Sequence, residues 1–147
     1  MTGAGFLDLA VELLNKNLLA KSHSPSEPLC RTIVSRAYYS SFHLARDYIV
    51  SLGFPETNQH QFLSDALIAS GEPGVARAGD LLRDLRTARG RADYDLAKPN
   101  VIKQVLSVDY LKSQIENATD VKGLLSAAST DEAKAIAKVG IGNFWRR

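Results

Sequence analysis

Apolar residues recur every three or four positions along most of the chain, and this spacing is typical of amphipathic helices that pack by one face. One such stripe passes through Val34, Tyr38, Phe42, Ala45 and Ile49. The strict alternation of apolar and polar residues that indicates strands is almost absent. We therefore predict an all-α fold, an up-and-down helical bundle of about five helices plus a short C-terminal helix.

Capping residues, glycines and prolines divide this pattern into separate helices. We predict helices at about residues 5–21, 25–52, 60–69, 75–96 and 100–125, and a short final helix that ends at 139. Small and polar residues at 126–129 separate a bundle, residues 1–127, from a C-terminal extension, residues 128–147. Residues 140–147 include the only tryptophan and are expected to be irregular, either docked on the bundle or a partner or frayed.

Length and composition fit one domain that needs no disulfide. A chain of 147 residues can bury a sizeable core, and Cys30 is the only cysteine. The histidines and this thiol show no metal-ligand spacing, so we expect neither a metal nor another cofactor. No signal peptide or long apolar run is apparent, which predicts a cytoplasmic protein that does not enter a membrane. The net charge of +2 is too small to indicate nucleic-acid binding by itself.

Ionisable side chains lie beside the apolar stripe of the second predicted helix. The residues on this flanking face, spaced by three or four positions, are Arg36, Tyr39, His43 and Arg46. Positions with this spacing fall together on one side of a helix. Burying an unpaired ion is costly, so a charge kept at a packing seam needs either a structural partner or a ligand.

The fourth predicted helix shows the same feature near its end. Arg86, Arg89 and Asp93 lie within about sixty degrees of one another around the helix axis. The four arginines of this region are Arg83, Arg86, Arg89 and Arg91. They could bind phosphates, whose geometry guanidinium groups match, or form a solvated face with intrahelical ion pairs. Gly90 costs about 1 kcal/mol relative to alanine, and such a glycine is commonest where another backbone or a ligand comes close.

Three elements of the sequence resemble the signatures of the HEPN superfamily, in particular of its small single-domain bacterial and archaeal members. In this chain they are Ala37-Tyr38-Tyr39 with Phe42-His43, then the isolated His60, then Arg89 with Ala92-Asp93-Tyr94. They occur in the family's order, and the resemblance covers roughly residues 5–120. It implies a helical bundle and a homodimer whose long helices pack across a twofold axis.

In active HEPN ribonucleases a histidine follows an arginine by a few residues, and two such motifs meet at the dimer interface and cleave RNA without metal. An imidazole can move a proton at the ribose 2′-hydroxyl or the leaving oxygen, while the arginine holds the phosphate. Here Arg89 matches the motif arginine, but Tyr94 stands where the histidine would be. Tyrosine is a poor general base at neutral pH. His43 or His60 would then supply the imidazole.

The resemblance therefore implies a composite site. The expected catalytic residues are Arg89, Asp93, Tyr94, His43 and His60, and the expected substrate-binding residues are Arg86, Arg36 and Tyr39. Structural interpretations stay open for the same residues. His43 could simply be bonded to Tyr39, a carboxylate or a carbonyl, and His60 could help to begin the third helix. Arg89 and Asp93 could form a buried ion pair across helices.

Our leading hypothesis is a HEPN dimer that cleaves or binds RNA or a nucleotide in a toxin–antitoxin or phage-defence system. The alternative is a catalytically silent dimeric partner of a minimal nucleotidyltransferase. In a related HEPN group such an enzyme adenylylates a tyrosine two residues after the motif histidine, but Leu96 occupies that position here. A third hypothesis is a structural bundle with a peptide-binding tail.

Overall fold

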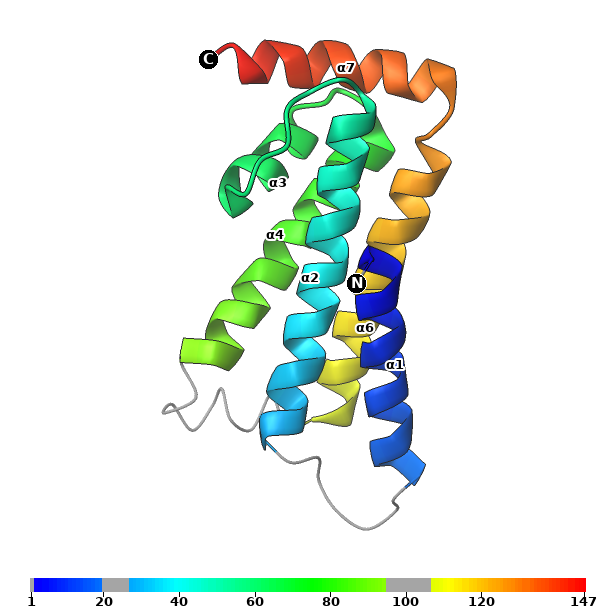
Figure 1. Cartoon of the computed structure of the whole chain (residues 1–147), viewed down its shortest axis with the longest axis vertical. Coiled ribbons are helices and arrows are strands. Elements are labelled where there is room, and N and C mark those ends of the chain that lie inside the picture. Colours follow the sequence, from blue (N-terminus) through cyan, green and yellow to red (C-terminus); the bar gives the residue numbers. More distant parts are fainter. Residues whose placement is uncertain (1, 20–26, 95–106) are drawn as a thin grey trace.

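Helices account for almost all of the structure that is described. In the computed structural model the described residues are 2–19, 27–94 and 107–147 (Figure 1). Their helices are α1 (Gly3–Leu19), α2 (Glu27–Ser51), α3 (His60–Ile68), α4 (Pro73–Tyr94), α6 (Val108–Ala127) and α7 (Asp131–Trp145). No strand occurs within these three ranges, so the predicted all-α fold is confirmed.

Helix α2 is the centre of the bundle and packs against α1, α3, α4 and α6. Figure 1 shows α1, α2, α4 and α6 running along the length of the molecule, while α7 lies across the end at which α2 and α6 finish. This arrangement is the predicted up-and-down bundle with a short C-terminal helix. Among the described helices, none is long and apolar enough to cross a membrane.

The predicted apolar stripe of α2 is buried along its whole length. Val34, Tyr38, Ala45 and Ile49 are at most 1% exposed, and Phe42 is 4% exposed. The largest fully buried side chains of the other helices are Leu63, Leu67, Val75, Leu82, Leu85, Leu111 and Ile141. Burial of each side chain of this kind contributes about 1.5–3 kcal/mol to the free energy of unfolding. The apolar stripes of the sequence therefore stabilise the fold by forming this core.

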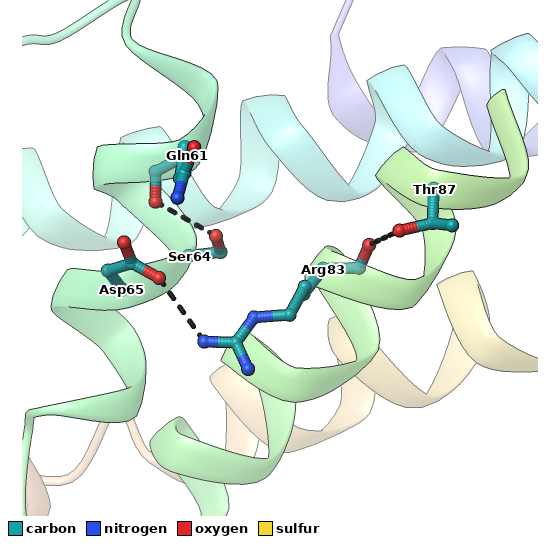
Figure 2. A network of polar contacts seen from close by, with 5 residues as sticks. All are labelled: Gln61, Ser64, Asp65, Arg83 and Thr87. Carbon is teal, nitrogen blue, oxygen red and sulfur yellow. Dashed lines mark hydrogen bonds and ion pairs between the residues drawn. The ribbon is translucent and has the colours of Figure 1, made fainter. Parts of the chain in front are cut away.

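Helix α3 is held against α4 by a close approach and an ion pair. A Cβ added to Gly79 would lie 2.9 Å from Ile68 N, so the glycine lets the backbone of α4 approach the backbone of α3 closely. Nearby, Arg83 Nη2 donates to Asp65 Oδ1 at 3.2 Å (Figure 2). The ion pair is largely exposed and contributes at most about 1 kcal/mol. Together these contacts position His60, the first residue of α3.

Helix α6 begins at a capping serine. Ser107 has an extended backbone, with φ −78° and ψ 126°, and its side chain caps α6 by accepting a hydrogen bond from Tyr110 N. Asp109 adds a negative charge in the first turn, where the helix dipole favours one. The helix therefore starts at Val108. The predicted start at about residue 100 lies outside the described residues.

The prediction of an irregular C-terminus is wrong, because α7 continues to Trp145. A Cβ on Gly140 would lie 2.0 Å from Ser70 O, so this glycine allows α7 to rest directly on the chain after α3. Trp145 then stacks on Phe54, with ring centroids 5.1 Å apart, and lies edge-on to Phe62 at 4.8 Å. These ring contacts stabilise α7 and offset the low helix propensity of its glycines. The prediction was wrong because it considered that propensity alone.

Candidate functional site

Six rings from three helices form an aromatic cluster at the edge of the core, to which two of the rings also belong. Its members are Phe6 of α1, then Tyr38, Tyr39, Phe42 and His43 of α2, and His60 of α3. Tyr39 is its centre, because its ring centroid lies 5.5 Å from that of Tyr38 and 6.4 Å from each imidazole. The cluster therefore brings together the two histidines that the sequence singles out.

Arg89 of α4 lies against this cluster. Its guanidinium carbon is 4.8 Å from the Tyr39 ring centroid and 5.5 Å from that of Tyr38. A cation over an aromatic face gains about 0.5–2 kcal/mol, more where water is excluded. The Nε atom lies 3.3 Å from Asp93 Oδ2, close enough for an ion pair. This buried Nε makes no hydrogen bond with a described residue, so the Asp93 contact is electrostatic attraction without good hydrogen-bond geometry.

The Tyr38 hydroxyl and Nδ1 of His60 are hydrogen-bonded to each other. Burial raises the pKa of Tyr38 to about 12, although Arg86 and Arg89 act in the opposite direction. Burial also lowers the pKa of His60 below its ordinary 6.5, and the nearby charges of Arg89 and Arg86 lower it further. At neutral pH the phenol is therefore protonated and the imidazole is neutral.

The direction of this hydrogen bond follows from the available partners. Within the described residues, Tyr38 has no other hydrogen-bond partner for its hydroxyl. A buried O–H group needs an acceptor, so we assign Tyr38 as the donor and Nδ1 of His60 as the acceptor. The proton of the neutral imidazole then resides on Nε2. In this state His60 offers a hydrogen-bond donor, and not a free base, at its second nitrogen.

His43 occupies the edge of the aromatic cluster that adjoins α1. Its ring stacks on Phe6, with centroids 5.2 Å apart and planes inclined by 5°. Burial lowers the pKa of His43, and Arg46 acts in the same direction. The His43 ring forms no hydrogen bond within the described part of the chain. It is therefore the imidazole of the cluster that has an uncommitted lone pair at neutral pH.

The structure also locates the remaining predicted site residues. Arg36 places its guanidinium carbon 5.2 Å from the Phe6 ring centroid, on the α1 side of the cluster. Arg86 is exposed, and its charge acts on both Tyr38 and His60. Tyr94 is the last residue of α4, but its side chain lies outside what the structure describes.

The geometry bears on the structural interpretations of the Arg89–Asp93 pair and of His60. Arg89 and Asp93 pair within α4, four residues apart, and not across helices. Each side chain of the pair is 24% exposed, so the pair is only partly buried. His60 does begin α3, but the N-cap residue before it is Gln59, which makes no side-chain capping bond. The His60 ring is instead held by Tyr38 and by Phe42, whose ring centroid lies 4.2 Å away.

A surface pocket of about 400 Å³ opens beside Tyr39, between the first half of α2 and the end of α4. The residues that line it are Pro28, Arg31, Thr32, Ser35, Arg36, Tyr39 and Asp93. Arg31 Nη2 donates to the backbone oxygen of Asp93 at 3.4 Å, which links the two helices that line the pocket. The pocket and the aromatic cluster therefore share Tyr39 as a common wall.

Sequence reasoning missed two residues of this region, Phe6 and Arg31. The signal for Arg31 was present, because Arg31, Ser35 and Tyr39 follow one another at four-residue spacing along one face of α2. Phe6 gave no such signal, since it reads as an ordinary member of the apolar stripe of α1. Its place beside His43 depends on how α1 packs on α2, which a one-dimensional pattern does not contain.

Comparison with protein-family models, with curated proteins and with solved structures found no match for this chain. The resemblance to the HEPN superfamily therefore rests on the motifs themselves. No group of three or more histidine, cysteine, aspartate or glutamate side chains suited to a metal ion occurs among the residues that the structure describes. The arrangement that stands out is a cation over two tyrosines, next to two neutral imidazoles.

Proposed function

We propose that this protein is a HEPN-family dimer that acts in the cytoplasm, binds RNA at the aromatic cluster and cleaves it without a metal ion. The observation that supports this most strongly is the position of Arg89 over Tyr38 and Tyr39, on whose rings His60 also lies. The three motif elements lie far apart in sequence, and their side chains meet in one cluster. Such convergence is expected of a site and is not required by the core.

Arg89 has the chemistry for holding a phosphate. Its guanidinium is fixed from one side by tyrosine rings, and a planar guanidinium can present two N–H groups to phosphate oxygens. Tyr39 is half-buried and lines the surface pocket, where an aromatic ring can stack on a base. Asp93 adds an electrostatic attraction to the arginine through the ion pair.

The proposed reaction is attack of a ribose 2′-hydroxyl on the adjacent phosphorus. A base takes the proton of that hydroxyl, the new O–P bond closes a cyclic phosphate, and the bond to the 5′-oxygen breaks. That leaving oxygen takes up a proton from water, and the base returns its proton to the solvent. His43, with its uncommitted lone pair, suits the base. His60 Nε2–H and Arg89 donate hydrogen bonds to the phosphoryl oxygens as negative charge develops there.

Incubation of the purified protein with total RNA in the presence of EDTA tests this proposal. Arg89→Ala should lower cleavage about a hundredfold or more, as the loss of one preorganised donor typically does. Arg77→Ala is the matched control, because Arg77 is an exposed arginine near the start of the same helix. Activity that disappears with EDTA, or that persists fully in Arg89→Ala, would contradict the mechanism.

The second candidate function is the silent dimeric partner of a minimal nucleotidyltransferase. It is favoured by Tyr94, which replaces the motif histidine. In that case the wild-type protein shows no turnover, expression does not arrest growth, and a nucleotidyltransferase encoded next to it binds the bundle. Binding of RNA that depends on Arg89, without cleavage, would instead make the protein an RNA-binding module of a toxin–antitoxin or defence system.

A further inference from the structure

The pocket between α2 and α4 carries uncompensated positive charge. Arg31 and Arg36 both line it, and neither forms an ion pair with a described residue. The carboxylate in the pocket, Asp93, is already paired with Arg89. Two unpaired guanidinium groups in a concave surface create a positive potential that attracts anions.

The other groups in the pocket favour a nucleotide over a simple anion. Tyr39 forms the wall shared with the aromatic cluster and supplies a ring face for a base. The Ser35 hydroxyl, which makes no hydrogen bond within the described residues, can donate to a phosphate or ribose oxygen. A pocket of about 400 Å³ lies within the usual size range for small-ligand sites.

We infer that this pocket binds a nucleotide phosphate through Arg31 and Arg36, with the base or ribose against Tyr39. The inference rests on the proposed function to the extent that the nucleotide is part of an RNA strand, whose neighbouring phosphate then reaches Arg89. The same chemistry could be supplied by a free nucleotide. Arg31 donates one N–H to the backbone oxygen of Asp93 and keeps the rest of its five donors for a ligand.

The test compares Arg31→Gln and Arg36→Gln with the control Arg77→Gln, using two probes. One probe is a short fluorescent oligouridylate followed by anisotropy at several salt concentrations, and the other is uridine 5′-monophosphate followed by chemical-shift changes. Glutamine removes the positive charge and keeps a polar side chain, although at position 31 it is two bonds shorter than arginine and gives up the contact with Asp93 O. Circular dichroism confirms that each variant keeps its helical content.

For each pocket variant, affinity should fall about tenfold or more, because a hydrogen bond to a charged group is lost. The slope of log affinity against log salt should also fall by about 0.7, the value for one phosphate contact on a single strand. Arg77→Gln should change neither quantity.

The outcomes separate this inference from the proposed function. If Arg89→Ala weakens RNA binding while Arg31→Gln and Arg36→Gln behave like the control with both probes, the pocket is not a nucleotide site and the proposed function stands. If the monophosphate binds in an Arg31-dependent manner but RNA does not bind, the pocket takes a free nucleotide and the proposed RNA function fails. Binding of neither probe by the wild-type protein overturns both.

Discussion

The hydroxyl of Tyr38 is hydrogen-bonded to Nδ1 of His60, and this bond joins the core of α2 to the first residue of α3. Tyr38 is fully buried, whereas the His60 ring is partly exposed, so the pair connects the interior with the candidate site. A buried phenol of this kind fixes the tautomer of its partner. Tyr38 therefore determines which His60 nitrogen carries the proton that faces a substrate, although Tyr38 itself is buried away from the surface.

Replacing Tyr38 with phenylalanine should raise the pKa of His60. The phenol donates to the neutral imidazole and stabilises that form, so its removal lets the imidazole protonate more easily. Titration of the His60 ring signals by NMR measures the change, and Tyr39→Phe serves as the control, since the Tyr39 hydroxyl makes no hydrogen bond with a described residue. A pKa that falls in Tyr38→Phe would show that Nδ1 is the donor, and the tautomer assignment would be wrong.

The stability of the protein should decrease as the pH falls below the ordinary histidine pKa of 6.5. His43 and His60 both have pKa values lowered in the folded state, mainly by burial. Between the folded and unfolded pKa values the unfolded chain binds more protons, so the free energy of unfolding rises with pH through that window. Urea unfolding at pH 7.5 and at pH 5.5 measures the effect. The decrease should be smaller in His60→Gln, and an equal decrease would exclude His60 as a contributor.

The sequence predicts the parts of the fold that depend on local periodicity. The stripe of α2 is buried as expected because a period of three to four residues already defines one face of a helix. The bond between Tyr38 and His60 was not predictable in this way. It spans 22 residues and depends on the orientation of α3, which the contacts of Gly79 and Asp65 with their neighbours determine.

At the C-terminus the prediction was wrong because it relied on local helix propensity, whereas tertiary packing determines the structure there. Gly140 and Gly142 argue against a helix when their propensity is considered alone. In the folded chain Gly140 meets the backbone of Ser70, and any side chain there would prevent the contact. Gly140 is therefore needed for the close approach of two segments and does not end the helix. The sequence alone cannot distinguish these two roles of a glycine.

Gly140→Ala should destabilise the docking of α7. The added Cβ would lie 2.0 Å from Ser70 O, so α7 must shift away from the bundle, and overpacking of this kind typically costs about 1–3 kcal/mol. Trp145 is the only tryptophan, and it contacts Phe54 and Phe62, so its fluorescence reports the docking directly. We expect red-shifted emission at lower urea concentrations than in the wild type. Unchanged emission and unfolding would contradict the close contact.

Substitution of Gly90 tests the proposed dimer, because its effect on self-association can be separated from its effect on the stability of one chain. A Cβ at Gly90 would meet no atom within 4 Å, and the same holds for Gly123 of α6. Both alanine substitutions should therefore raise the free energy of unfolding of one chain by about 0.5–1 kcal/mol, the usual gain from replacing a mid-helix glycine.

The two variants differ only if another chain approaches α4 closely at Gly90. In that case Gly90→Ala should weaken self-association, measured by sedimentation equilibrium or light scattering at micromolar concentration, while Gly123→Ala should leave it unchanged. The arginines beside Gly90 give the interface a positive character, so added salt should strengthen association by screening their mutual repulsion. A wild-type protein that is monomeric under all these conditions would remove the basis for a site shared between two copies. The aromatic cluster and Arg89 would then have to act within one chain.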